Sequence, residues 1–203
     1  MECFGRLTAG LRQDLQERPV STPEQATVVP PAMCHARSYV AALREGFRRG
    51  EQEIVSERRA RQIEADFAGY LAAITDQRGH ITLASGERVR KVPFSLHWLC
   101  DGDEFIGEAS IRHQLNAHLM QEGGHIGYGI RPSRRDRGYG KRILALALVE
   151  CRRLGIERVL VTCLERNIAS ARIIEANGGG LENVIAAPSG HGALRRYWID
   201  LSA

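Results

Sequence analysis

The chain has 203 residues and a formal net charge of +4, with 43% hydrophobic and 26% charged residues. This balance is typical of a single globular domain of ordinary size and excludes a largely disordered chain. Residues 134–142 alone carry five cationic side chains and one acidic side chain, so the rest of the chain is close to neutral. That distribution favours a local anion site over a broad nucleic-acid-binding face.

Targeting and cysteine patterns exclude further classes of protein. The N-terminus lacks the unbroken apolar core of a signal peptide, and no stretch reaches the ~20 apolar residues that span a bilayer. Five widely spaced cysteines without a C-x-x-C pair predict neither a disulfide framework nor a zinc site. We therefore expect a cytoplasmic protein without a metal, a membrane contact or a nucleic-acid partner.

The N-terminal segment differs in pattern from the rest. Apolar residues at positions 4, 7, 11 and 15 recur with helical spacing and predict a short amphipathic helix. The polar residues 18–25 that follow predict a linker. We therefore divide the chain into an N-terminal helix and linker over residues 1–25 and one domain over residues 26–203.

The domain alternates between extended and helical patterns. The turn Asp101–Asp103 separates two extended runs and predicts a hairpin, and a later amphipathic helix ends before Gly155. In chain order we expect a strand at 26–31, helices at 35–49 and 58–74, strands at 92–100, 104–113 and 124–132, a helix at 141–154, a strand at 158–164, a helix at 168–176, and strands at 181–187 and 194–201.

A strand, a loop rich in arginine and glycine, and a helix follow one another over residues 124–154. The first N–H groups of a helix lack intrahelical partners and lie at the positive end of its dipole, so they suit phosphate. Gly138 and Gly140 would let the backbone approach an anion. Arg135 replaces the first glycine of a Walker A loop, and Ile143 replaces the last glycine of a dinucleotide fingerprint, so neither motif is present. A solvated basic turn is the structural alternative.

The loop resembles that of a known family. Arg135-Asp136-Arg137-Gly138-Tyr139-Gly140 is similar to the [RQ]-x-x-G-x-[GA] loop that wraps the pyrophosphate of acetyl coenzyme A in the GCN5-related N-acetyltransferases (GNAT). Ile130-Arg131-Pro132 resembles the V-x-P at the end of the family's fourth strand, and Asn167 with Ser170 resembles its pantetheine-contacting N-x-x-[AS]. The resemblance covers most of the chain from about residue 27. Within the family, the chain looks like a bacterial subgroup of predicted acetyltransferases.

The resemblance implies a fold, a cofactor and its binding residues. The implied fold is α/β (α+β), with a mixed, mostly antiparallel seven-stranded sheet flanked by helices and splayed between its fourth and fifth strands. The implied cofactor is acetyl-CoA, whose pantetheine would pair with backbone groups near Tyr128 and Ile130 as an added strand does. The implied coenzyme-binding residues are Ile130, Arg135, Arg137, Gly138, Tyr139, Gly140, Lys141, Asn167 and Ser170.

Acetyl transfer also needs an acid for the thiolate and a base for the ammonium. Many relatives supply the acid with a tyrosine seven residues after the asparagine, but Ile174 stands there in this chain. The available phenols are those of Tyr128, Tyr139 and Tyr197. The candidate bases are His125, Glu122 and Glu108, with a water chain as an alternative base. Tyr197 could instead belong to the core, and His125 could hydrogen-bond a turn.

The acceptor is the least defined part. Arg112, His113 and Asn116 form a polar group at a strand end that could line an acceptor pocket, for example for a carboxylate, or could be solvated. The leading hypothesis is an acetyl-CoA-dependent N-acetyltransferase acting by direct attack of a primary amine on a small molecule or peptide. The alternative, motivated by Ile174, is an acyl-CoA-binding sensor without turnover. The terminal strand and the extra N-terminal helix are compatible with a homodimer.

Overall fold

The structure is a computed structural model that describes residues 22–50, 53–83 and 85–202. The helix predicted at residues 4–15 lies outside these residues. The helices are α1 (Ala36–Arg44), α2 (Glu57–Ala65), α3 (Phe67–Thr75), α4 (Ala117–Gln121), α5 (Tyr139–Arg153) and α6 (Ile168–Glu175), with short 3-10 turns at Pro23–Gln25, Met33–His35 and Pro132–Arg134. The strands are β1 (Thr27–Val29), β2 (His80–Thr82), β3 (Arg88–Arg90), β4 (Phe94–Asp101), β5 (Glu104–Arg112), β6 (Ile126–Ile130), β7 (Arg158–Leu164), β8 (Gly180–Ala186) and β9 (Ala193–Asp200).

Seven of these strands form two antiparallel sheets. One sheet has the order β1-β4-β5-β6 and the other the order β7-β9-β8, while β2 and β3 pair as a separate hairpin. The predicted fold class, antiparallel strands flanked by helices, is confirmed. The strands lie in two sheets rather than in one continuous sheet, because β6 and β7 form no ladder with each other.

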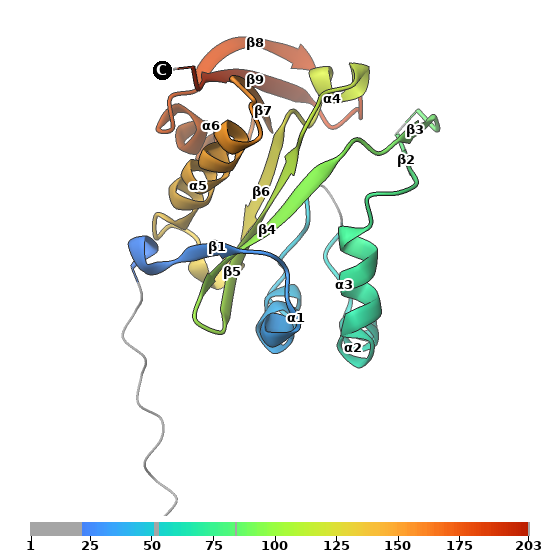
Figure 1. Cartoon of the computed structure of the whole chain (residues 1–203). Helices are drawn as coiled ribbons and strands as arrows, with labels where there is room; N and C mark the ends of the chain where they lie inside the picture. Colours follow the sequence, from blue (N-terminus) through green and yellow to red (C-terminus); the bar gives the residue numbers. More distant parts are fainter. Residues whose placement is uncertain (1–21, 51–52, 84, 203) are drawn as a thin grey trace, which may run out of the picture.

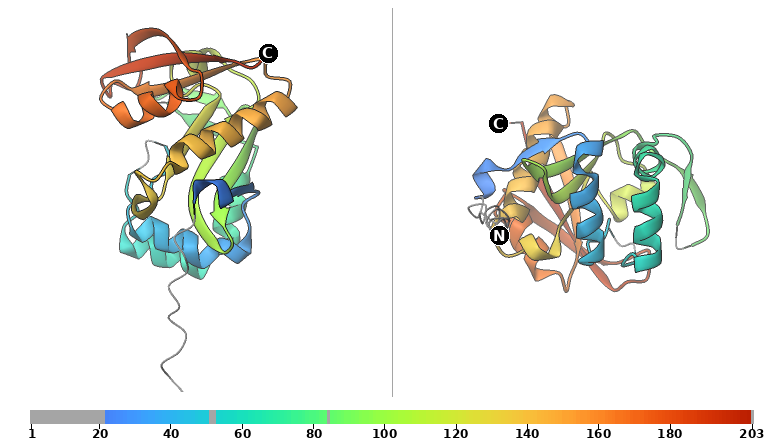
Figure 2. Two further views of the ribbon diagram at one scale, coloured as in Figure 1. Left: turned by 90° about the vertical axis from the view of Figure 1, so that its left-hand side faces the viewer. Right: turned by 90° about the horizontal axis from the view of Figure 1, so that it is seen from below.

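Helices cover both faces of the four-stranded sheet (Figures 1 and 2). Helix α5 crosses one face, and α1, α2 and α3 lie on the other. Each face has its own hydrophobic cluster: one joins α5 to both sheets, and the other packs α1 and the residues after it on Trp98 and Phe105. Tyr39 of α1 stacks on Trp98 with ring centroids 4.7 Å apart. These two clusters hold the helices against the two faces of the sheet.

Two predicted helices differ from the observed ones. The helix expected at 35–49 ends at Arg44, and Gly46 with φ +91 then turns the chain toward β6. The helix expected at 58–74 is divided at Asp66, whose Oδ1 accepts a hydrogen bond from the N–H of Gly69 and begins a new helix. The short helix α4 and the hairpin β2-β3 were not predicted, since each contains five residues or fewer per element.

Among the residues that the structure describes, no helix is both long and apolar enough to cross a membrane.

Candidate active site

The two sheets touch at one end of β6 and separate beyond it. The N–H of His125 donates to the carbonyl of Leu160 at 2.7 Å, and the N–H of Leu160 donates to Nδ1 of His125 at 2.9 Å. The N–H of Arg131 donates to the carbonyl of Ile106, so these two residues form a hydrogen-bonded pair of the antiparallel ladder. Hydrogen-bonded and non-hydrogen-bonded pairs alternate along such a ladder, and Tyr128 belongs to a non-hydrogen-bonded pair. Its backbone N–H and carbonyl therefore point away from β5, toward β7. The edge of β6 is thus available to an added strand.

The loop before α5 has the backbone geometry of an anion cradle. Gly138 is the N-cap residue of α5 and has φ +87, a conformation that favours glycine. A Cβ on Gly138 would lie 3.2 Å from Pro23 Cγ, and a Cβ on Gly140 would lie 2.5 Å from Ile173 Cδ1. Within the described part of the chain, no backbone carbonyl accepts from the N–H groups of Arg137, Gly138 or Gly140. These donors at the positive end of a helix fit a phosphate group.

The cationic side chains of the loop divide into two groups. Arg134 pairs with Glu104 at 2.8 Å, and Arg142 donates to the carbonyls of Glu24 and Ala26. Those two arginines therefore hold the loop against neighbouring segments. Arg135 donates to the carbonyl of Ile130 at 3.2 Å through Nε and keeps its other donors at the exposed surface.

Arg137 and Lys141 form the second group. Both are exposed, and neither side chain has an ion-pair partner among the described residues. The charge that remains for an anion therefore comes mainly from these two residues and from Arg135. From the sequence, all five cations of the loop were expected to be available to an anion, because the glutamate that pairs with Arg134 is thirty residues away in the chain.

Tyr128 faces helix α6 across the edge of β6. Its hydroxyl lies 3.0 Å from Oγ of Ser170, and Asn167 caps α6 by accepting a hydrogen bond from the N–H of Ser170 at 3.1 Å. Burial raises the pKa of Tyr128 to about 12, so its hydroxyl keeps its proton at neutral pH. The structure brings together three residues that were predicted to lie along the pantetheine arm of the coenzyme.

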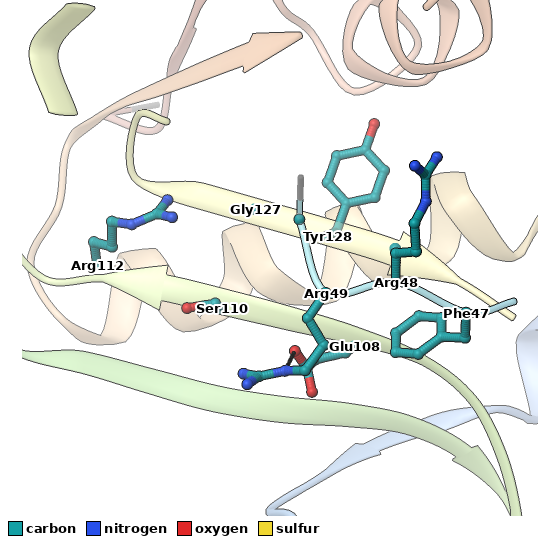
Figure 3. A pocket seen from close by; sticks show the side chains of 10 residues that line it. Phe47, Arg48, Arg49, Glu108, Ser110, Arg112, Gly127 and Tyr128 are labelled. Carbon is teal, nitrogen blue, oxygen red and sulfur yellow. Dashed lines mark hydrogen bonds and ion pairs between the residues drawn. The ribbon is translucent and has the colours of Figure 1, made fainter. Parts of the chain in front are cut away.

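A cavity of about 180 Å³ opens on the other face of β6 (Figure 3). Gly127 pairs with Ser110 and Gly129 pairs with Glu108, so two successive positions on this face of β6 carry no side chain. Tyr128 lies between these glycines and projects its ring from the opposite face, as alternation along a strand requires. The lining residues are Phe47, Arg48, Arg49, Gly50, Glu108, Ser110, Arg112, Gly127, Tyr128 and Gly129.

Glu108 is the one carboxylate among the lining residues that the structure describes. Its Oε1 accepts from Nε of Arg49 at 2.6 Å, and its Oε2 accepts from Nε1 of Trp98 at 3.0 Å. The side chains of Arg49 and Glu108 are 19% and 7% exposed. This buried pair fixes the segment after α1 over the floor of the cavity.

Four of the seven predicted catalytic and acceptor residues lie away from the cavity lining. Nδ1 of His125 already accepts a backbone hydrogen bond, and burial together with the nearby Arg112 lowers the pKa of His125 to about 4. Tyr197 is fully buried in the core and donates to Glu175 at 3.1 Å. His113 pairs with Ser95 Oγ at 2.7 Å, and Asn116 caps α4. Each of these side chains makes at least one hydrogen bond within the protein.

Sequence reasoning missed the residues of the turn after α1. Arg48 and Arg49 approach β6 only in the folded chain, almost sixty residues from Glu108. The alternating glycines of the segment Gly127-Tyr128-Gly129 were the available signal, because a strand with glycine at every second position has one face without side chains.

Comparisons with known proteins bear on the family and on the fold. The sequence model of an acetyltransferase (GNAT) domain matches residues 41–179. No curated protein matches the chain. RimJ of Mycobacterium smegmatis in complex with CoA-disulfide is 15% identical, with a TM-score of 0.61, and the match covers 86% of this chain and 81% of that one.

Two further solved structures share the fold. The ribosomal L7/L12 alpha-N-protein acetyltransferase RimL in complex with coenzyme A is 16% identical with a TM-score of 0.54, covering 91% of this chain and 98% of that one. AAC(6')-Ib in complex with ribostamycin and coenzyme A is 12% identical with a TM-score of 0.57, covering 86% and 93%. Since the domain match spans well over half of the sequence, the chain belongs to the GNAT acetyltransferase family, as an acyltransferase whose cosubstrate is acetyl-CoA.

Proposed function

We propose that the domain at residues 26–203 transfers the acetyl group of acetyl-CoA to a primary amine of a small molecule or a peptide by direct attack. The observation that carries this proposal is the arrangement around β6. Tyr128 and Ser170 meet on one side of the strand, and a cavity with Glu108 lies on the other. A donor for a leaving thiolate and a site for an amine therefore border the same strand edge.

The loop residues bind the coenzyme in this proposal. The N–H groups at the start of α5, with Arg135, Arg137 and Lys141, hold the pyrophosphate, and Gly138 and Gly140 leave room for it. Ile130, Asn167 and Ser170 line the path toward the thioester, whereas the side chain of Tyr139, predicted to bind the coenzyme, is buried in the core beneath the loop. Acetyl-CoA supplies the activated acyl carbon.

The side chains around β6 move the protons. The amine nitrogen bonds to the carbonyl carbon, the carbon–sulfur bond breaks, and Tyr128 gives its proton to the departing thiolate. Glu108 takes the proton that the ammonium loses, directly or through one water. After attack the nitrogen loses a second proton, which restores the phenol of Tyr128 through solvent. The balance is one amide, one free thiol and one released proton, with no covalent acyl-enzyme.

The sensor alternative rests on Ile174, which occupies the position of the usual tyrosine. That side chain is fully buried in the hydrophobic core. The phenol of Tyr128 reaches α6 from the opposite strand, beside Ser170, and so supports turnover without a tyrosine at position 174.

Two measurements together test the proposal. Isothermal titration with acetyl-CoA is expected to give binding in the micromolar range or tighter, and thiol release over a panel of primary amines is expected to exceed the amine-free rate. Binding without thiol release would support the sensor instead. A protein that binds no acetyl-CoA would contradict both functions.

A further inference from the structure

The cavity beside β6 has an excess of positive charge. Three arginines line it, Arg48, Arg49 and Arg112, against the one carboxylate of Glu108. Arg49 is already paired with that carboxylate at 2.6 Å. Among the described residues, neither Arg48 nor Arg112 has an acidic partner. A polycationic acceptor would meet repulsion in this cavity.

Arg112 is held in place by one of its nitrogens only. Its Nη1 donates to the carbonyl of Gly123 at 3.0 Å and to that of Gly124 at 3.1 Å, which uses both hydrogens of that atom. Nε and Nη2 have no hydrogen-bond partner in the described part of the chain. Burial lowers the pKa of Arg112, as expected for a charge that has lost water without gaining a counter-ion.

The two remaining donors of Arg112 lie on one edge of the guanidinium plane. The Nε–H and Nη2–H bonds of an arginine are parallel, and a carboxylate accepts both at once in a bidentate pair. An ammonium, a hydroxyl or an aliphatic group offers no matching pair of acceptors. The open edge of Arg112 therefore selects a planar anion.

We propose that the acceptor is a small primary amine that also carries a carboxylate, and that Arg112 binds this carboxylate through Nε and Nη2. This inference rests on the proposed acetyl transfer and narrows its acceptor to amino-acid-like molecules.

The position of the Arg112 guanidinium group supports a small acceptor. An ideal Cβ on Gly127 would lie 3.8 Å from Nη1 and Nη2 of Arg112, at van der Waals contact, so the guanidinium group lies next to Gly127. Glu108 stands opposite Gly129, two residues further along β6. Two residues of a strand span ~7 Å, which a short amino acid can bridge. The cavity, at about 180 Å³, is below the ~300 Å³ of drug-sized ligand sites.

The test uses matched pairs of amines. Thiol release from acetyl-CoA is measured with glycine, β-alanine, 4-aminobutyrate and leucine, each against its carboxamide, at equal concentrations of unprotonated amine. For at least one pair, the wild-type protein is expected to have a kcat/KM at least about tenfold higher for the carboxylate, because a site built for a charged group rejects its neutral analogue. Arg112→Gln is expected to bring that ratio near one, through KM rather than kcat.

Controls separate this specificity from folding and from coenzyme binding. Arg112→Lys keeps a cation that can donate to the carbonyls of Gly123 and Gly124 but loses the paired donors of the guanidinium group. It replaces the glutamine variant if that variant fails to fold. Its carboxylate-to-carboxamide ratio is expected to fall as well. Arg58→Gln removes an exposed cation of α2 outside the cavity lining and is expected to leave the ratio within about twofold. The Kd of acetyl-CoA is expected to be equal in all variants.

The outcomes distinguish this inference from the proposed function. Acetylation of carboxamides and carboxylates at equal kcat/KM in every pair, or a carboxylate preference that survives in both Arg112 variants, overturns the role of Arg112 and leaves acetyl transfer standing. Coenzyme binding without transfer to any amine overturns the proposed function, and the inference with it.

Discussion

The hydroxyl of Tyr128 lies 3.0 Å from Oγ of Ser170, and this contact joins β6 to α6 where the two sheets separate. In the GNAT motif that this chain resembles, the residue at Ser170 contacts the pantetheine arm. The phenol of Tyr128 therefore approaches the expected path of the thiol from the strand side. Ile174, at the position of the family's usual tyrosine, is in the core.

Replacing Tyr128 with phenylalanine tests the acid. Removing a general acid lowers catalysis by about 10²-fold or more. We expect Tyr128→Phe to lower kcat by that factor while the Kd of acetyl-CoA, measured by isothermal titration, changes by less than about threefold. Ser170→Ala removes the partner hydroxyl but not the phenol and is expected to lower kcat less. A phenylalanine variant with full kcat would exclude Tyr128 as the donor.

Gly138 tests the anion cradle. Gly138→Asp would place a carboxylate beside the pyrophosphate and a Cβ about 3.2 Å from Pro23, so we expect acetyl-CoA affinity to fall by more than about thirtyfold, or about 2 kcal/mol. Arg135→Ala is expected to cost less, because Arg137 and Lys141 share the anion and solvent screens each charge. Isothermal titration measures both.

Gly155→Asp is the matched control for the backbone strain that an aspartate introduces where glycine has a positive φ. Gly155 also has a positive φ, +73, and follows the opposite end of α5, where a Cβ would meet no atom within 4 Å. We expect this variant to lose stability but to keep coenzyme affinity. Equal losses of affinity in Gly138→Asp and Gly155→Asp would contradict the placement of the pyrophosphate at the loop.

The proposed coenzyme half of the site was more predictable from sequence than the proposed acceptor half. The loop, Asn167 and Ser170 lie within two short segments, and their chemistry depends on backbone geometry that glycine and a helix start encode locally. The acceptor cavity depends on Arg49 reaching Glu108 and on Arg112 reaching the carbonyls of Gly123 and Gly124, which only the tertiary fold defines.

The helices and strands show the same contrast between local sequence pattern and tertiary structure. The longer strands and α5 and α6 were predicted within two residues or so, because their apolar periodicity extends over several turns or pleats. The separation of the strands into two sheets was implied by the resemblance rather than by any strand's own pattern. The cytoplasmic location, the homodimer and the absence of a nucleic-acid partner stay predictions.

The pair of Arg49 and Glu108 is expected to stabilise the fold as well as the site. Removing one partner of a buried pair leaves the other charge uncompensated, so we expect Glu108→Gln and Arg49→Met each to lower the free energy of unfolding by about 2 kcal/mol. The double variant is expected to lose at least about 1 kcal/mol less than the sum of the two. Urea unfolding of the four proteins measures this coupling.

The exposed pair of Arg61 and Glu57 is the control for that cycle. Its side chains are 75% and 49% exposed, so its coupling energy is expected to be about 0.5 kcal/mol or less. A coupling at Arg49 and Glu108 no larger than this would contradict the view that the pair anchors the turn after α1.

His125 is expected to make stability depend on pH. Burial lowers its pKa to about 4 in the folded chain, against an ordinary value of 6.5. Between these values the unfolded chain binds a proton at His125 and the folded chain does not, so the free energy of unfolding falls as the pH falls from 6.5 to about 4. His125→Asn keeps an acceptor for the N–H of Leu160 but does not titrate, so its stability should fall less steeply over that window. His191→Asn, at an exposed loop position, should keep the wild-type slope. The measurement is the urea unfolding midpoint as a function of pH across this window. Parallel curves for the wild type and His125→Asn would mean that His125 is already protonated in the folded protein. That result would restore His125 as a candidate for acid–base chemistry near neutral pH.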